Sequence, residues 1–183
     1  MLDLISLLAI ITSLFTMSSA FAAPKTFKFD EEARIDEVRI DVPFAWKAAR
    51  DLYGVPLFLL GPVRNEERPT LAVTPTGISD LRFDETALKQ DEAQYQKGRA
   101  EWLKNRGGEL NSYLPYVVDA KNTKRIVHSI GVFYTIRSLS FVERSYYIFC
   151  GKKSYHLKSL NLTSDVESAK LLSGAVETFH CLR

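Results

Sequence analysis

The sequence contains few of the residues from which recognisable chemical sites are built. Its 183 residues include three histidines and two cysteines, and no two of these five lie two to five positions apart, as zinc ligands usually do. The glycine pattern of a phosphate-binding loop and the G-x-S-x-G elbow of serine hydrolases are also absent. We therefore expect no cofactor and no metal site, and no residue is predicted to be catalytic.

An excess of charge of one sign is missing too. Lysine and arginine number 24 and aspartate and glutamate 22, which gives a net charge of +2. Without residues 1–22, which contain Asp3 as their one charged residue, the net charge is 24 − 21 = +3. The basic residues form no stripe or cluster, so nucleic-acid binding is not expected.

No apolar run is long enough to cross a bilayer, which takes about 20 residues. The longest run, from Leu4 to Phe15, is followed by Ala20 and Ala22, the small residues of an A-x-A cleavage site. This pattern predicts a signal peptide over residues 1–22 and an exported protein, periplasmic or secreted. Because Asp3 precedes the run and no lysine or arginine does, an uncleaved anchor remains the alternative, and membrane contact is expected only through it.

The remainder, residues 23–183, has the composition of one globular domain, with 46% hydrophobic and 25% charged residues and no internal repeat. A chain of this size buries about 70% of its unfolded surface without help from metals. The most informative stretch contains three runs rich in β-branched and aromatic residues, 126–136, 141–149 and 154–160. Gly151-Lys152 suits a two-residue turn, so the three runs predict an antiparallel meander.

The other elements are predicted from alternation, helical spacing and turn residues. We expect a long helix over 87–106, with Leu88, Tyr95 and Trp102 on one face and glycines at its end. A capping box at Ser164–Glu167 predicts a last helix that continues to Cys181. The full set is an extended arm over 24–32, strands at 38–42, 55–60, 70–74 and 113–119, a short helix at 44–53, the meander and the two long helices. The fold class is α+β.

The two cysteines, Cys150 and Cys181, are predicted to form a disulfide. The third strand of the meander carries the chain away from Cys150 by roughly 23 Å, and a helix over 165–181 returns it by about 25 Å. These lengths nearly cancel, which brings the cysteines within the ~6 Å between Cα atoms that a disulfide needs. The alternative is two unrelated buried thiols.

The order of elements and two short motifs resemble the PsbP/Mog-like superfamily, which includes the bacterial DcrB-like envelope proteins. The motifs are Ile40-Asp41-Val42-Pro43-Phe44-Ala45-Trp46, similar to the "strand, V-P-x-x-W" opening of the family, and the Leu59-Leu60-Gly61-Pro62 hairpin. The resemblance implies an antiparallel sheet with helices on both faces. It also implies a protein that binds protein partners and is not an enzyme, and the signal segment favours the envelope branch.

Three functions remain open at this stage. The first is a non-enzymatic envelope protein, expected to be monomeric, that binds an unknown protein partner as an assembly factor or chaperone-like adaptor. Candidate contact residues lie in the charged loop between two prolines: Arg64, Glu66, Glu67 and Arg68. The second is a small hydrolase built around His128 or His156, and the third is a small-ligand carrier with a cleft between the sheet and the long helix. The tyrosines of the meander form either a partner surface or the lining of its covered faces: Tyr134, Tyr146, Tyr147 and Tyr155.

Overall fold

A computed structural model describes residues 21–31, 34–76, 85–122 and 125–182. The predicted signal peptide, residues 1–22, lies outside this part of the chain except for Phe21 and Ala22, which begin the first strand. Among the described residues, no helix is both long and apolar enough to span a membrane.

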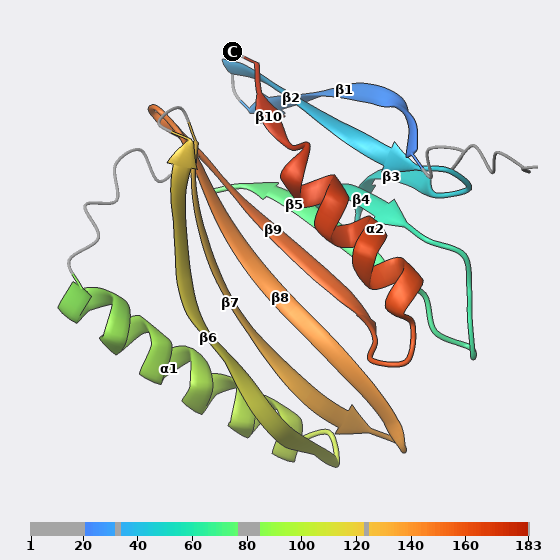
Figure 1. Cartoon of the computed structure of the whole chain (residues 1–183), viewed down its shortest axis with the longest axis vertical. Coiled ribbons are helices and arrows are strands. Elements are labelled where there is room, and N and C mark those ends of the chain that lie inside the picture. The colour runs from blue at the N-terminus through green and yellow to red at the C-terminus, as the bar shows by residue number, and fades with distance from the viewer. Residues whose placement is uncertain (1–20, 32–33, 77–84, 123–124, 183) are drawn as a thin grey trace, which may run out of the picture.

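The fold is α+β, as expected, and its main element is an antiparallel sheet of seven strands in the order β3-β4-β5-β9-β8-β7-β6 (Figure 1). The strands are β3 (Lys47–Leu52), β4 (Val55–Leu60), β5 (Thr70–Pro75), β6 (Gly108–Asn122), β7 (Arg125–Ile136), β8 (Leu139–Cys150) and β9 (Lys153–Leu162). The predicted meander is confirmed as β7, β8 and β9. The turn at Gly151, whose φ is +66°, pairs Cys150 with Lys153 and so sets the register of β8 against β9.

Two helices cover opposite faces of this sheet, which confirms the predicted layers. The long helix α1 (Glu85–Lys104) contacts β6 and β7, and it ends before Gly107, which has the positive φ typical of a residue that follows a helix. The second helix, α2 (Val166–Glu177), contacts β9 on the other face. We call the two sides of the sheet the α1 face, which includes Val132, Tyr134 and Glu143, and the α2 face, which includes Phe133 and Leu157.

The last helix is shorter than expected. Asp165 caps it by accepting a hydrogen bond from the backbone of Ser168 at 3.1 Å, and the helix ends at Glu177 instead of continuing to Cys181. Phe179 then enters the core, and β10 (His180–Cys181) pairs with β2 (Arg34–Pro43). Burial of the Phe179 ring and strand pairing therefore override helical periodicity at this end.

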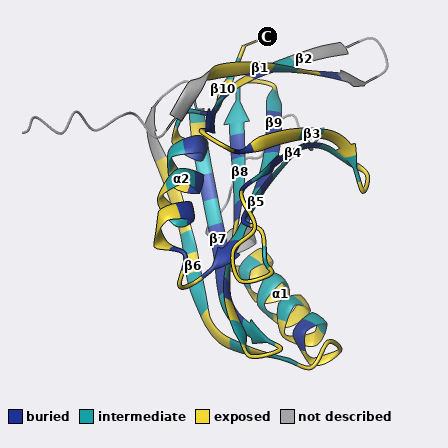
Figure 2. Cartoon of the chain, turned by 90° about the vertical axis from the view of Figure 1, so that its right-hand side faces the viewer, coloured by how far each residue is buried: buried dark blue, intermediate teal, exposed yellow. Residues whose placement is uncertain are grey.

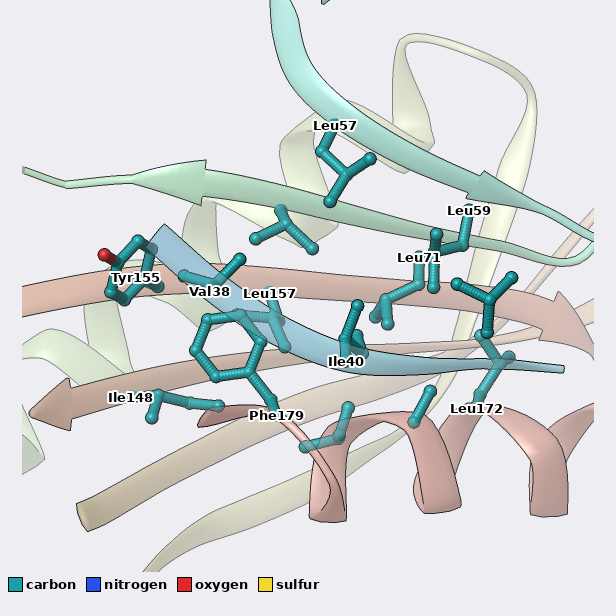
Figure 3. Packing of buried hydrophobic residues seen from close by; sticks show 14 of the residues in the cluster. Val38, Ile40, Leu57, Leu59, Leu71, Ile148, Tyr155, Leu157, Leu172 and Phe179 are labelled. Atoms are coloured by element: carbon teal, nitrogen blue, oxygen red, sulfur yellow. The ribbon is translucent and has the colours of Figure 1, made fainter. Parts of the chain in front are cut away.

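The predicted arm is part of a second sheet. β1 (Phe21–Glu31), β2 and β10 form three antiparallel strands that lie near α2 (Figure 1). The alternating residues of β2, Val38, Ile40 and Val42, are all buried, which confirms the strand predicted there. This small sheet, α2 and the α2 face enclose the larger of the two cores (Figure 3).

The predicted helix over 44–53 is wrong, because this segment contains the edge strand β3. Pro43 accepts a backbone hydrogen bond from Trp46 at 3.1 Å, and the turn so formed directs Lys47 onto β4 opposite Leu60. The Trp46 ring is buried against Gly61, where a Cβ would lie only 2.9 Å from it. Without β3, β4 would be left as an unpaired edge, so pairing outweighs local helix propensity. Most of β3 is exposed (Figure 2).

The predicted disulfide between Cys150 and Cys181 is confirmed, with 6.2 Å between the Cα atoms. The return path differs from the expected one, since the final approach is made by β10 and not by a helix. The disulfide joins the small sheet to the end of β8. It thereby closes the core that both sheets share.

Candidate functional site

The two candidate histidines lie in one row across the α1 face. His128 on β7 is opposite Tyr147 on β8, and Tyr147 is opposite His156 on β9. The rings of Tyr147 and His156 stack with centroids 4.7 Å apart, and Tyr116 of β6 contacts His128 Nδ1 through its hydroxyl at 2.5 Å. Strand spacing puts two intervals of about 4.8 Å between the backbones of the histidines. They share a row but do not touch one another.

Burial dominates the electrostatics of this row. It lowers the pKa of His156 to about 4, helped by the neighbouring positive charge of Lys158, and it lowers the pKa of His128 as well. Burial likewise raises the pKa of Tyr116 and, on α1, of Tyr95. Near pH 7 these groups are therefore neutral, and they form an uncharged polar layer between α1 and the sheet.

A buried carboxylate next to this row holds α1 in place. Glu143 on β8 is 3% exposed, accepts a hydrogen bond from Arg99 of α1 at 2.9 Å and forms an ion pair with Lys158 of β9 at 3.1 Å. The Arg99 guanidinium also lies 4.2 Å from the Trp102 ring centroid. This ion-paired cluster of Glu143, Arg99 and Lys158 joins the helix to two strands.

The row is better suited to packing than to catalysis. His128 is 4% exposed, and the Nε2 atom of His156 is buried with no hydrogen-bond partner among the described residues. Cys150 and Cys181 are both oxidised in the disulfide, so neither is a thiolate nucleophile. In the described part of the chain, no three His, Cys, Asp or Glu side chains are grouped so that they could hold a metal ion.

A groove of about 360 Å³ lies on the α2 face, between α2 and the strands β7 to β9. The burial pattern of β7 is consistent with this groove. On the α2 face Phe133 is only half-buried, whereas the alternate residues on the α1 face are buried: His128, Ile130, Val132 and Tyr134. Because α2 covers the β9 side, the β7 and β8 side of this face is open. The lining consists of Phe133, Val142, Arg144, Tyr146, Ser159, Asn161, Thr163, Val166, Ala169, Leu172 and Ser173. We call it the α2 groove.

A second groove, of about 430 Å³, lies on the α1 face beyond the C-terminal end of α1. Five apolar side chains and three charged ones line it: Tyr134, Ile136, Leu139, Phe141 and Leu160, with Glu67, Arg106 and Arg137. Tyr134 and Phe141 are stacked with centroids 5.3 Å apart. We call it the α1-end groove.

The four loop residues proposed as partner contacts have separate roles in the structure. Arg64 pairs with Asp165 at 3.1 Å and Glu167 at 2.9 Å, so it fastens the loop to the start of α2. Arg68 donates a hydrogen bond to the carbonyl of Gly61 at 2.8 Å, Glu67 lines the α1-end groove, and Glu66 is exposed. Arg64 therefore connects the loop to α2, and the predicted role of these four residues as partner contacts stays a prediction.

The meander tyrosines divide between the two faces, as the lining interpretation expects. Tyr155 and Tyr134 are buried, and Tyr146 and Tyr147 are half-buried. Tyr146 alone of the four lines the α2 groove. The row of His128, Tyr147 and His156 was not foreseen from the sequence. The sequence did contain information on part of this row, because the turn at Gly151 fixes which residues of β8 and β9 are opposite one another.

Comparison with known proteins extends this description at the level of the fold. No family model matches the chain, and no curated protein sequence is similar to it. The solution structure of cyanobacterial PsbP (CyanoP) from Synechocystis sp. PCC 6803 is similar, with a TM-score of 0.57 and 10% identity over 94% of this chain and 99% of that one. The chain has a PsbP-like fold.

The crystal structure of LpqN, described as involved in cell envelope biogenesis of Mycobacterium tuberculosis, is a weaker match. It has a TM-score of 0.49 and 12% identity over 88% of this chain and 93% of that chain. At such identities the similarity concerns the architecture only. The function must therefore be argued from the grooves and the buried groups of this chain.

Proposed function

We propose that the mature protein is a non-enzymatic envelope protein of the cell exterior or periplasm that binds a protein partner through the α2 groove. Two features support export: the Ala20-x-Ala22 cleavage pattern and the disulfide, which persists in oxidising compartments. An assembly factor or chaperone-like adaptor is the role that fits such a protein best.

The observation that carries this proposal is the half-covered α2 face. α2 lies over the β9 side, and the groove next to it has a floor of half-buried side chains that include Phe133, Val142 and Tyr146. Val166, in the first turn of α2, lines the same groove and is 60% exposed. A contiguous group of exposed apolar side chains, especially in a groove, often marks a binding site on a soluble protein.

The lining suits a polypeptide. Aromatic and aliphatic groups alternate with hydrogen-bonding ones, including Arg144, Ser159 and Thr163, as in the interfaces between proteins. A helix satisfies its own backbone hydrogen bonds, so it can lie on strands that offer no free edge. We therefore expect the partner to present an amphipathic helix, with its apolar side against Phe133 and Tyr146.

The hydrolase alternative has less support. It requires His128 or His156 to reach a substrate, but His128 is 4% exposed and the Nε2 atom of the half-buried His156 is itself buried.

The test is affinity capture of the tagged mature protein from an extract of its own cell envelope. Replacing Val166 and Val142 with Gln makes the α2 groove polar and should weaken binding of the partner about tenfold, which corresponds to a combined loss of about 1.4 kcal/mol from the two apolar contacts. The matched control replaces Val118 and Ile126 with Gln. Both are exposed and lie on the α1 face, at 47% and 39% exposure.

A partner retained by the wild type and by the control, and lost with the α2-groove variant, supports the proposal. Equal loss with both variants would indicate a general effect of polarity on recovery. Full retention by the α2-groove variant, with its unfolding midpoint unchanged, would show that the partner binds elsewhere.

A further inference from the structure

The α1-end groove is chemically different from the α2 groove. Its floor is formed by apolar and aromatic side chains from β7, β8 and β9: Tyr134, Ile136, Leu139, Phe141 and Leu160. Its volume of about 430 Å³ is within the range of small-molecule sites, about 300–1,000 Å³. Of its three charged side chains, Arg106 and Arg137 are exposed and Glu67 is half-buried, and we call these three the rim.

The rim has two arginines against one glutamate. Arg106, just beyond α1, and Arg137, in the turn between β7 and β8, have no ion-pair partner among the described residues. In contrast, Arg64 and Arg99 pair with acidic groups. The guanidinium of Arg106 lies 4.3 Å from the ring centroid of Trp102, which leaves its edge able to donate to an anion.

The single acidic group is on another side of the groove. Glu67 belongs to the connection between β4 and β5, next to the β9 side, whereas Arg106 follows α1 on the β6 side. An anionic head is therefore attracted to the arginines and repelled from Glu67. A molecule with one anionic end should therefore bind in one orientation, with that end next to the arginines.

The floor discriminates against a peptide. Each of the strands β7, β8 and β9 is paired with a neighbour on both sides, so the floor has no free strand edge. An extended peptide laid across it would leave amide and carbonyl groups facing hydrocarbon, which is costly, because it lacks the internal hydrogen bonds of a helix. An alkyl chain has no such groups.

From this combination we propose that the α1-end groove binds a long-chain fatty acid. Its carboxylate is held between Arg106 and Arg137, and its alkyl chain lies along the half-buried side chains of Ile136 and Leu139 toward Leu160. This site is on the opposite face of the sheet from the α2 groove, so it does not depend on the partner proposed above.

The test is a calorimetric or fluorescence titration of the full mature protein with monomeric palmitate, accompanied by two amphiphiles of equal chain length. Hexadecanol lacks the charge, and hexadecyltrimethylammonium reverses it. Palmitate should bind at least tenfold more tightly than hexadecanol, and the cationic amphiphile should bind more weakly than both. Replacing Arg106 and Arg137 with Gln should remove that tenfold preference, whereas Glu67→Gln should increase the affinity for palmitate.

Arg144→Gln is the matched control, because Arg144 is an exposed arginine that lines the other groove. It should leave palmitate binding unchanged. Palmitate binding that survives loss of both arginines, or that falls with Arg144→Gln, would overturn the proposal. So would equal affinity for palmitate and hexadecanol, or competition by an acidic, apolar peptide for the same site. Arg106 and Arg137 are exposed, so their replacement should not unfold the protein. Glu67→Gln should increase the affinity, a result that misfolding cannot produce.

Discussion

The two faces of the same three strands are built from different chemistry. On the α2 face, the meander meets α2 and the small sheet through aliphatic and aromatic groups such as Leu157, Ile148 and Phe179 (Figure 3). On the α1 face, the same strands carry His128, Glu143 and His156. The first face is held by burial of apolar area, and the second also depends on protonation states and ion pairs. The α1 face should therefore respond to pH and to loss of single charges, whereas the α2 face should respond to loss of volume.

The largest effect is expected from a cavity on the α2 face. Phe179 is completely buried, and its ring meets that of Tyr155 at 5.2 Å between centroids. Phe179→Ala should lower the free energy of unfolding by about 3–5 kcal/mol, because it removes apolar contact and leaves a cavity. Urea unfolding measures this, and Phe44→Ala is the control because Phe44 is 76% exposed. Similar losses from both variants would mean that Phe179 is not a core residue.

The disulfide should contribute nearly as much. Cys150 and Cys181 close a loop with a sequence separation of 31, for which the chain-entropy account gives about 3–4 kcal/mol. Replacing both with Ser should reduce the unfolding free energy by this amount. Adding reductant should weaken the wild type to the same level and leave the variant unchanged. Two free thiols in the unfolded, non-reduced protein would refute the disulfide and weaken the case for export.

The ion-paired cluster tests the α1 face. Glu143→Leu leaves Arg99 and Lys158 without their acidic partner, and we expect a loss of about 2 kcal/mol because Lys158 is partly solvated. Adding Arg99→Met and Lys158→Met should recover most of that loss, since it removes the unpaired charges as well. If the triple variant is as unstable as the single one, Glu143 contributes by packing and not by pairing.

The smallest effect is a pH dependence from the same face. The pKa of His156 in the folded protein is about 4, below the ordinary value near 6.5, so the unfolded chain binds more protons between these values. Its contribution to stability is thus complete above pH 6.5 and is lost as the pH falls toward 4. His156→Phe keeps a ring against Tyr147 and should flatten this part of the pH profile. His180→Gln, on the exposed β10, should change the profile less.

Much of this architecture could be predicted from residue patterns. The meander follows from three runs of strand-forming residues and from Gly151, and the disulfide follows from the lengths of the elements between its cysteines. These predictions succeeded because local signals and tertiary packing agree there. The pairing of β10 was missed because it depends on a strand far away in the sequence, β2. The strand β3 was missed for another reason: its pairing with β4, the next strand along the chain, outweighs the local helix pattern.

The candidate sites were less predictable for a similar reason. His128 and His156 were identified as individual residues, but their row with Tyr147 exists only through the register of three strands. Each groove combines residues from different elements, such as Phe133 with Val166 on the α2 face. How much of a sheet face stays uncovered depends on where the helix lies on it. The periodicity of apolar residues does not predict that position. The attachment of the charged loop to α2 was not predictable from the sequence, because the pairing of Arg64 with Asp165 crosses 101 positions.

The most direct test of the central claim, that the open α2 face receives a protein partner, is site-specific photo-crosslinking in the native envelope. A photoreactive side chain is placed at Val166 in one variant and at Val118, an exposed valine on the α1 face, in another. We predict a discrete protein adduct from position 166 and none of the same mass from position 118. An equal or stronger adduct from position 118, or no adduct from position 166, would contradict the account.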